Sequence, residues 1–335
     1  MGAGASAGGS QRPHRARVAR VRAEECWRSG RGQAFLAGMK CAASLGDAGG
    51  PDRAGATAPL TDPCASIDDL TIVRAEGHFG SFVGAASDLV VHGTYRRTGT
   101  WAPDLHALLV DDLLARGGSF LDVGANIGLV AIPVTEVCPI RTFAFEPDPR
   151  TAELLVRNVA LHGLEQRLAV HACALWSEDD RLTLHRHSEN HGDHRIMRES
   201  AARGAQAMGV RVEARRLDAL VDPGRLARPI VAKLDTQGAE VDVLLGAGSV
   251  LREIDGLVCE IWPAGLARLG RTLTELVELL AREFAWAKLL LPGEPVWPLR
   301  PLREELGRLD AVPTLDDAGT FFDALLARSP RRDRA

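Results

Sequence analysis

Two glycines and an aspartate are spaced as a ligand-binding loop requires. Gly124 and Gly128 follow a short apolar run, and Asp122 lies two residues before the first glycine. Glycine lets a backbone turn sharply and approach a ligand closely. A dinucleotide fingerprint would read G-x-G-x-x-G. This loop reads G-x-x-x-G, and its acid suits an ammonium or sulfonium group better than a diphosphate. We therefore expect Asp122, Gly124, Ala125, Asn126 and Gly128 to bind a cofactor.

Two further acids are expected at the same site. Glu146 ends the next apolar run, about 20 residues after Gly124, where a carboxylate can accept hydrogen bonds from two ribose hydroxyls. With the glycine loop, it favours a cofactor that contains adenosine. Glu178 follows the third apolar run, where an acid could contact an adenine amino group. The alternatives are a solvated acid or a helix N-terminal charge for Glu146, and an exposed turn for Glu178.

Three ionisable residues near a later glycine turn, at Gly238, are candidates for catalysis. Lys233, Asp235 and Glu240 could take a proton from a hydroxyl nucleophile, directly or by holding a divalent metal. Lysine occurs only three times in the chain, which draws attention to Lys233. The alternative is a buried ion pair that orients the loop, with Glu240 as a helix N-terminal charge.

A histidine-rich interval separates these two groups of residues. Four of the ten histidines lie between residues 185 and 195, and the polar interval runs to about Val210. Imidazole is a good metal ligand, but the spacing fits no compact zinc pattern, so we assign no metal ligand. The portion Asn190–Arg195 could bind an acceptor molecule, with His194 as a base. A solvated mobile loop is the alternative.

Strands that alternate with helices must position these residues. The expected strands are Ser119–Val123, Arg141–Glu146, Leu168–Ala174, Ile230–Asp235 and Leu257–Ile261. The expected helices are Asp104–Ala115, a run to about Val137, Pro149–Leu161, one from about Ala239 and Leu273–Phe284, and short strands are expected at Leu70–Val73 and Ser87–His92. Such alternation is typical of βαβ units. The predicted fold class is α/β, with a Rossmann-like, doubly wound and mostly parallel sheet.

Composition divides the chain into four parts. Residues 1–65 are rich in Gly, Ala, Ser and Arg and show no periodicity, so we expect disorder there. Residues 66–118 should form the N-terminal part of the domain and residues 119–291 its Rossmann-like core. Residues 292–335 are expected to be a Pro-rich arm and a charged tail.

Charge and hydropathy exclude several classes of protein. The 335 residues are 46% hydrophobic with a net charge of -4, which gives no general attraction to nucleic acid or anionic membrane. No apolar run reaches the roughly 18 residues of a transmembrane helix. Six dispersed cysteines fit a reducing compartment, so a cytoplasmic location is expected. These features leave the oligomeric state open.

The motifs taken together resemble a known family. They are F-L-D-V-G-A-N-I-G at 120–128, F-E-P at 145–147, N-V-x-L-H-G at 158–163, L-D-A-L at 217–220, K-L-D-T-Q-G-A-E at 233–240 and E-I-W-P at 260–263. The run from about Ser119 to Pro263 is similar to the FkbM family of methyltransferases. The family pattern at 233–240 usually reads K-x-D-x-E-G-A-E, so Gln237 departs from it.

The resemblance implies a fold of the class I methyltransferase type, S-adenosylmethionine as methyl donor and, commonly, O-methylation. The acceptor would be a hydroxyl on a small molecule such as a secondary metabolite, a sugar or a glycan. Two alternatives stay open. Gln237 points to a weakly active or inactive member that binds the donor. A nicotinamide-dependent oxidoreductase would share the sheet, but it predicts a G-x-G-x-x-G that is missing.

Overall fold

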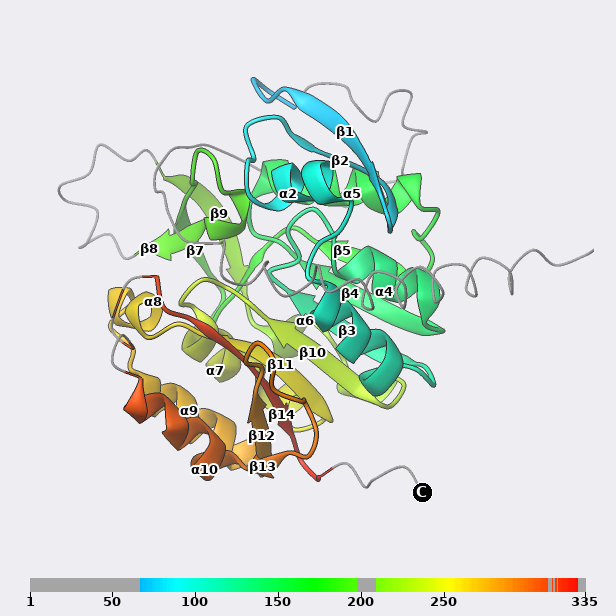
Figure 1. Ribbon diagram of the computed structural model, residues 1–335. Helices are drawn as coiled ribbons and strands as arrows, with labels where there is room; N and C mark the ends of the chain where they lie inside the picture. The colour runs from blue at the N-terminus through cyan, green and yellow to red at the C-terminus, as the bar shows by residue number, and fades with distance from the viewer. Residues whose placement is uncertain (1–66, 198–208, 313–314, 316, 318, 331–335) are drawn as a thin grey trace, which may run out of the picture. The chain divides into compact units, whose positions relative to one another are not determined.

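The computed structural model describes residues 67–197, 209–312, 315, 317 and 319–330. The expected disorder of residues 1–65 lies outside these described residues. An eight-stranded sheet forms the centre of the described part (Figure 1), in the order β13-β12-β14-β11-β10-β3-β4-β5. Its strands are β13 (Arg300–Pro301), β12 (Trp286–Leu289), β14 (Phe322–Ala327), β11 (Gly256–Ile261), β10 (Ile230–Leu234), β3 (Gly118–Val123), β4 (Ile140–Phe145) and β5 (Leu168–His171).

The pairing of the strands confirms the predicted fold class. Strands β5, β4, β3, β10 and β11 are parallel neighbours, and β14 is antiparallel to both β11 and β12. In chain order the parallel part reads 3-2-1-4-5, the order of the doubly wound nucleotide-binding folds. The order reverses between β3 and β10, and ligands of such sheets bind at the carboxyl ends of the strands at that point. The switch point therefore lies between β3, which contains Asp122, and β10, which contains Lys233.

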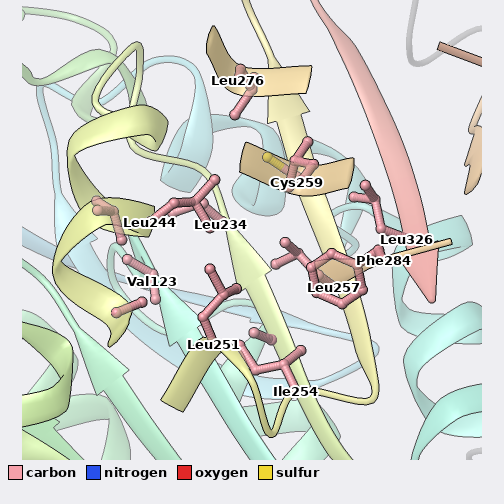
Figure 2. Packing of buried hydrophobic residues seen from close by; sticks show 14 of the residues in the cluster. Val123, Leu234, Leu244, Leu251, Ile254, Leu257, Cys259, Leu276, Phe284 and Leu326 are labelled. Carbon is pink, nitrogen blue, oxygen red and sulfur yellow. The ribbon is translucent and has the colours of Figure 1, made fainter. Parts of the chain in front are cut away.

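Helices cover both faces of the sheet because successive strand residues point to opposite sides. Leu121 and Ala232 belong to the largest buried cluster, which Figure 2 shows with residues from α7 (Glu240–Leu251) and α9 (Leu273–Glu283). Phe120 and Val231, the residues that precede them in the same strands, pack instead with η3 (Leu108–Leu113), a π-helix, and α4 (Ala131–Val137). The other described helices are α2 (Val91–Thr98), α3 (Pro103–Ala107), α5 (Pro149–Leu161), α6 (Leu217–Leu220), η4 (His191–Asp193), η5 (Pro223–Arg225), α8 (Pro263–Arg268), α10 (Leu302–Leu306) and η6 (Gly307–Ala311).

Local sequence explains where the principal helices begin. Helix α5 starts at Pro149, whose fixed backbone suits the first helical position, and the Asp148 side chain caps it by accepting from Arg150 N. Helix α9 begins with a capping box formed by Thr272 and Glu275. Both helices fall where the sequence places them, within one residue at each end.

Two smaller sheets stand beside the central one. The hairpin β1 (Ile72–Gly77) and β2 (Gly80–Ala85) packs with α2 and α5. The second sheet has the order β6-β9-β7-β8, formed by β6 (Ala174–Leu175), β9 (Val210–Arg215), β7 (Asp180–His185) and β8 (Arg195–Met197). This sheet holds the described part of the histidine-rich interval.

Several sequence predictions of elements are wrong. Ser87–His92 is a turn that leads into α2, not a strand, because Asp88 accepts the backbone N–H groups that begin this helix. The third strand ends at His171 rather than Ala174, and the chain then leaves the central sheet. The expected charged tail contains β14, which lies inside the sheet between β12 and β11. Among the described residues, no helix is both long and apolar enough to span a membrane.

Candidate functional site

The glycine loop at the end of β3 is held tightly against the two neighbouring strands. The backbone N–H groups of Gly124 and Ala125 both donate to the carbonyl of Phe145, at 3.0 Å each. Gly124 has a φ of 82°, and a Cβ at this position would lie 1.9 Å from the carbonyl oxygen of Asp235. A side chain at 124 would therefore push the β3 and β10 loops apart, which explains why this turn needs glycine.

Glu146 is buried against the glycine loop and is not a solvated strand-end acid. Its Oε2 accepts from Asn126 N at 3.0 Å, and its Oε1 accepts from Asp148 N at 2.9 Å. Burial raises the pKa of Glu146 to about 8, although the hydrogen bonds from Asp148 N and Asn126 N oppose this shift. Each carboxylate oxygen has a second acceptor position, so the group can still receive two hydroxyl hydrogen bonds.

Lys233 joins three groups at the switch point of the sheet. Its Nζ donates to the carbonyl of Gly124 at 3.1 Å and lies 3.2 Å from Asp235 Oδ2 and 3.5 Å from Asp122 Oδ1. Burial alone lowers the pKa of Lys233, but the carboxylates of Asp235 and Asp122 outweigh it and raise this pKa. Lys233 thus ties the two loops together as the common partner of both carboxylates and of the Gly124 carbonyl.

Asp122 is the fully buried member of this group. None of its side chain is exposed, and neither oxygen accepts a hydrogen bond of normal length from a described residue. Burial raises the pKa of Asp122, with Lys233 opposing that shift. A buried carboxylate without hydrogen-bond donors is costly. Its position beside Gly124 therefore fits a ligand that supplies donors or positive charge.

Asp235 is the accessible carboxylate of the site, with a side chain that is 36% exposed. Its Oδ1 accepts from Gln237 Nε2 at 2.9 Å. The same amide nitrogen lies 3.2 and 3.1 Å from the two oxygens of Glu260. Gln237 also has a φ of 55°, an uncommon backbone conformation for a residue with a side chain. The residue that departs from the family pattern therefore links two carboxylates by donating to both.

The contacts of Glu240 match the alternative interpretation, in which this residue orients the loop. The residue is completely buried, and its Oε1 accepts from Thr236 N, Thr236 Oγ1 and Gly238 N at 3.0 to 3.1 Å. These bonds fix the turn that carries Gln237. Burial raises the pKa of Glu240, while the hydrogen bonds oppose the shift. Glu240 orders the loop and presents no free face to an acceptor.

His194 is engaged at both ring nitrogens. Its Nδ1 accepts from His187 N at 3.1 Å, and its Nε2 lies 3.3 Å from Asp148 Oδ2. Arg186 also binds Asp148, with its Nη2 2.8 Å from Oδ1. Burial alone raises the pKa of Asp148, but the bonds from His194 and Arg186 outweigh it and hold this pKa below its ordinary value. These contacts tie His194 to Asp148 and to the backbone of its own loop.

The histidine-rich loop lies beside the glycine loop, as an acceptor-side segment would. Asn126 Nδ2 donates to the carbonyl of His191 at 2.8 Å, and His191 N donates to Asp88 Oδ1 at 3.3 Å. Asp88 belongs to the segment before α2. Hydrogen bonds therefore connect the glycine loop, the histidine-rich loop and the segment before α2. Among the described residues, no group of three or more His, Cys, Asp or Glu side chains is arranged to hold a metal ion.

The structure does not bring Glu178 to the site. Glu178 is exposed in the turn after β6, and the preceding Trp176 carbonyl packs against Gly246 of α7. The residue at the corresponding strand end is His171, whose ring stacks on Phe145 with centroids 4.9 Å apart. Its backbone carbonyl accepts from Glu146 N at 3.1 Å. β5 ends three residues after Leu168, so the residue at its carboxyl end is His171 and not Glu178.

Comparison with known proteins identifies the domain. Residues 122–281 match the model of the methyltransferase FkbM domain. Over this range, a little under half of its length, the chain is similar to the FkbM methyltransferase family. The matched range of this FkbM domain begins at Asp122 and includes the glycine loop, Glu146 and the Lys233–Glu240 segment.

Named relatives agree with this assignment over part of their length. Methyltransferase 1 of Beauveria bassiana is 30% identical over 158 residues, which are 42% of this chain and 63% of that protein. Hexuronic acid methyltransferase AglP of Haloferax volcanii is 27% identical over 147 residues, 42% of this chain and 54% of that protein. The chain thus spans less than two thirds of each relative. Geranyl diphosphate C-methyltransferase of Streptomyces coelicolor aligns with a TM-score of 0.38 and 11% identity, over 68% of this chain and 80% of that one.

Proposed function

We propose that the FkbM domain is an S-adenosylmethionine-dependent methyltransferase that binds its donor at the β3–α4 loop. The observation that carries this proposal is the pair of buried carboxylates, Asp122 and Glu146, on either side of the turn at Gly124. A sulfonium donor has a positive charge and two ribose hydroxyls, and carboxylates at these positions can attract that charge and accept further hydrogen bonds from those hydroxyls. The proposed binding set is Asp122, Gly124, Ala125, Asn126, Gly128 and Glu146. We do not include Glu178, because it is exposed in the turn after β6.

The proposed reaction is transfer of the methyl group to a hydroxyl oxygen of the acceptor. The bound donor supplies an electrophilic methyl carbon, and the acceptor oxygen forms a bond to it as the sulfur–carbon bond breaks. The hydroxyl proton must leave, and Asp235 is the exposed carboxylate that can accept it. Lys233 and Gln237 each bind one Asp235 oxygen, so the carboxylate is held in a single orientation. Such alignment is the main contribution that an enzyme makes to this reaction.

The acceptor that we propose is a hydroxyl on a sugar, a glycan or another small molecule. Support comes from the relative named as a hexuronic acid methyltransferase. The histidine-rich loop would bind the acceptor, since Asn126 ties it to the proposed donor site. His194 would then position this loop, and Glu240 the Gln237 turn, instead of exchanging protons.

The test is transfer of an isotopically labelled methyl group from S-adenosylmethionine to a panel of sugars and sugar acids. The proposal expects label in at least one acceptor, with little label when Asp235→Asn replaces the native protein. Donor binding without transfer to any acceptor would support the alternative of an inactive donor-binding member. A failure to bind the donor would refute the site itself.

A further inference from the structure

Two arginines from distant parts of the chain converge on one tryptophan beside the proposed acceptor site. The Cζ of Arg268, at the end of α8, lies 3.9 Å from the centroid of the Trp262 ring. The Cζ of Arg195, the first residue of β8, lies 4.7 Å from the centroid of that ring. The two elements belong to different parts of the fold (Figure 1), so the pair is a product of tertiary structure.

The two guanidinium groups are unequally neutralised. Arg195 forms an ion pair with Asp193 through both oxygens of that carboxylate. Arg268 donates to the carbonyl of Ala264 at 3.3 Å, and no carboxylate of the described residues forms an ion pair with it. Burial, followed by the charge of Arg195, lowers the pKa of Arg268 to about 10. The group therefore has one uncompensated positive charge, which a bound anion would stabilise.

The tryptophan that both arginines contact lies near the turn at Gln237 and Gly238, which follows Asp235. Gly265 separates the Trp262 ring from that turn, because a Cβ at Gly265 would be 2.4 Å from Trp262 Cε3 and 3.1 Å from Gly238 Cα. Gly238 directly follows Gln237, which binds Asp235. On its other side, Arg195 ends the loop that Asn126 ties to the glycine loop. Both arginines thus stand at the border of the site where the acceptor hydroxyl must be.

Apart from Lys233, the ionisable groups around Asp235 are carboxyl groups. Glu260 lies opposite Asp323 in the β11–β14 ladder, and Gln237 connects Glu260 to Asp235. An anionic group on the acceptor would be repelled from Asp235 and attracted to the arginines. An acceptor with a hydroxyl and a separate anionic group would therefore bind in one orientation, with the hydroxyl toward Asp235.

We propose that Arg195 and Arg268 bind the carboxylate of an acidic sugar whose hydroxyl is the methyl acceptor. This inference rests on the proposed function and names its substrate class. A carboxylate matches the single uncompensated charge, whereas a sugar phosphate would bring close to two negative charges. Arginine also matches a carboxylate geometrically, since its planar fork can donate two parallel hydrogen bonds.

The experiment is calorimetric titration of the full chain, saturated with S-adenosylhomocysteine, with glucuronic acid, glucose and glucose 6-phosphate. The expected result is that glucuronic acid binds at least about tenfold more tightly than glucose, as one charge-assisted hydrogen bond can provide. The variant Arg268→Met keeps an apolar stem over Trp262 and should lose most of this preference. Arg225→Met is the matched control, because Arg225 is 87% exposed and its ion-pair partner Asp222 is itself 61% exposed.

Three outcomes would overturn the inference. They are equal binding of glucuronic acid and glucose, no binding of glucuronic acid, and a preference that Arg268→Met leaves unchanged. Tighter binding of glucose 6-phosphate would reassign the pair to a phosphate. None of these outcomes decides the proposed function, which fails if the folded protein does not bind S-adenosylhomocysteine or transfers no methyl group to any acceptor. Unchanged S-adenosylhomocysteine affinity in Arg268→Met would show that this variant is folded.

Discussion

Replacing Gln237 with glutamate tests the connection between Asp235 and Glu260. The side chain keeps its shape but loses its two N–H donors and gains a charge. The amide nitrogen that it replaces lies 2.9 Å from Asp235 Oδ1 and 3.1 Å from Glu260 Oε2. Two unit charges about 3 Å apart repel by roughly 5 kcal/mol at an effective dielectric constant of about 20. The variant must therefore take up a proton or lose stability.

Proton uptake limits the loss and makes it depend on pH. Burial, followed by the charges of Asp235 and Glu240, already raises the pKa of Glu260 well above its ordinary value. The carboxyl introduced by Gln237→Glu should likewise have a raised folded-state pKa. A raised carboxyl pKa means that stability is retained at low pH and is lost as pH rises through the folded-state pKa. Each pH unit between the unfolded-state pKa and that raised folded-state pKa costs about 1.4 kcal/mol, so we expect a deficit of roughly 2–4 kcal/mol near pH 8 and a smaller one near pH 5.

The assay is urea unfolding followed by tryptophan fluorescence between pH 5 and pH 8. Gln237→Met is the matched control, because it removes the same donors without adding a charge, and its deficit should change much less with pH. If Gln237→Glu and Gln237→Met have the same pH dependence, the electrostatic reasoning about the Asp235–Glu260 pair is wrong. Mg²⁺ could also be added to both proteins. If it stabilises Gln237→Glu but not the native protein, the Gln237 amide occupies the position that a cation would take between Asp235 and Glu260.

Three more predictions follow from the geometry of the donor site. Gly124→Ala should lower S-adenosylhomocysteine affinity at least about tenfold, because its Cβ would lie 1.9 Å from the Asp235 carbonyl oxygen. Calorimetry measures this affinity, and an unchanged value would exclude the close approach of the two loops. Glu146, whose pKa burial raises to about 8, costs stability as pH rises through that value. Glu146→Gln should flatten the pH dependence of urea unfolding between about pH 4.5, the ordinary pKa of the carboxyl, and about pH 8, and an unaltered slope would contradict the shift. Asp235→Asn should leave S-adenosylhomocysteine affinity within about twofold while lowering kcat by roughly 10²–10⁴, and full turnover would remove Asp235 from the mechanism.

The parts of the fold that depend on local patterns were predictable from sequence. Apolar strands that end in glycine turns identified β3 and β10, and helix-spaced leucines identified α9. The same patterns placed Glu146 correctly at the end of β4. These features are encoded within 10 to 15 neighbouring residues, so they do not require knowledge of the tertiary contacts.

The features that were missed depend on contacts between distant residues. β14 resembles other short apolar runs, and only its antiparallel pairing with β11 and β12 places it inside the sheet. The chain leaves the central sheet after His171, which moves Glu178 away from the donor site. The hydrogen bonds that engage His194 and Glu240 come from backbone groups whose positions no sequence pattern specifies.

The central claim is tested most directly by calorimetric titration of the native protein with S-adenosylmethionine, and with NAD in a parallel sample. The account predicts a saturable binding of S-adenosylmethionine, none of NAD, and loss of binding in Gly124→Asp, which adds a charge where a Cβ has no room. A folded protein that binds NAD instead, or that binds S-adenosylmethionine equally well after Gly124→Asp, would contradict the assignment of the donor site.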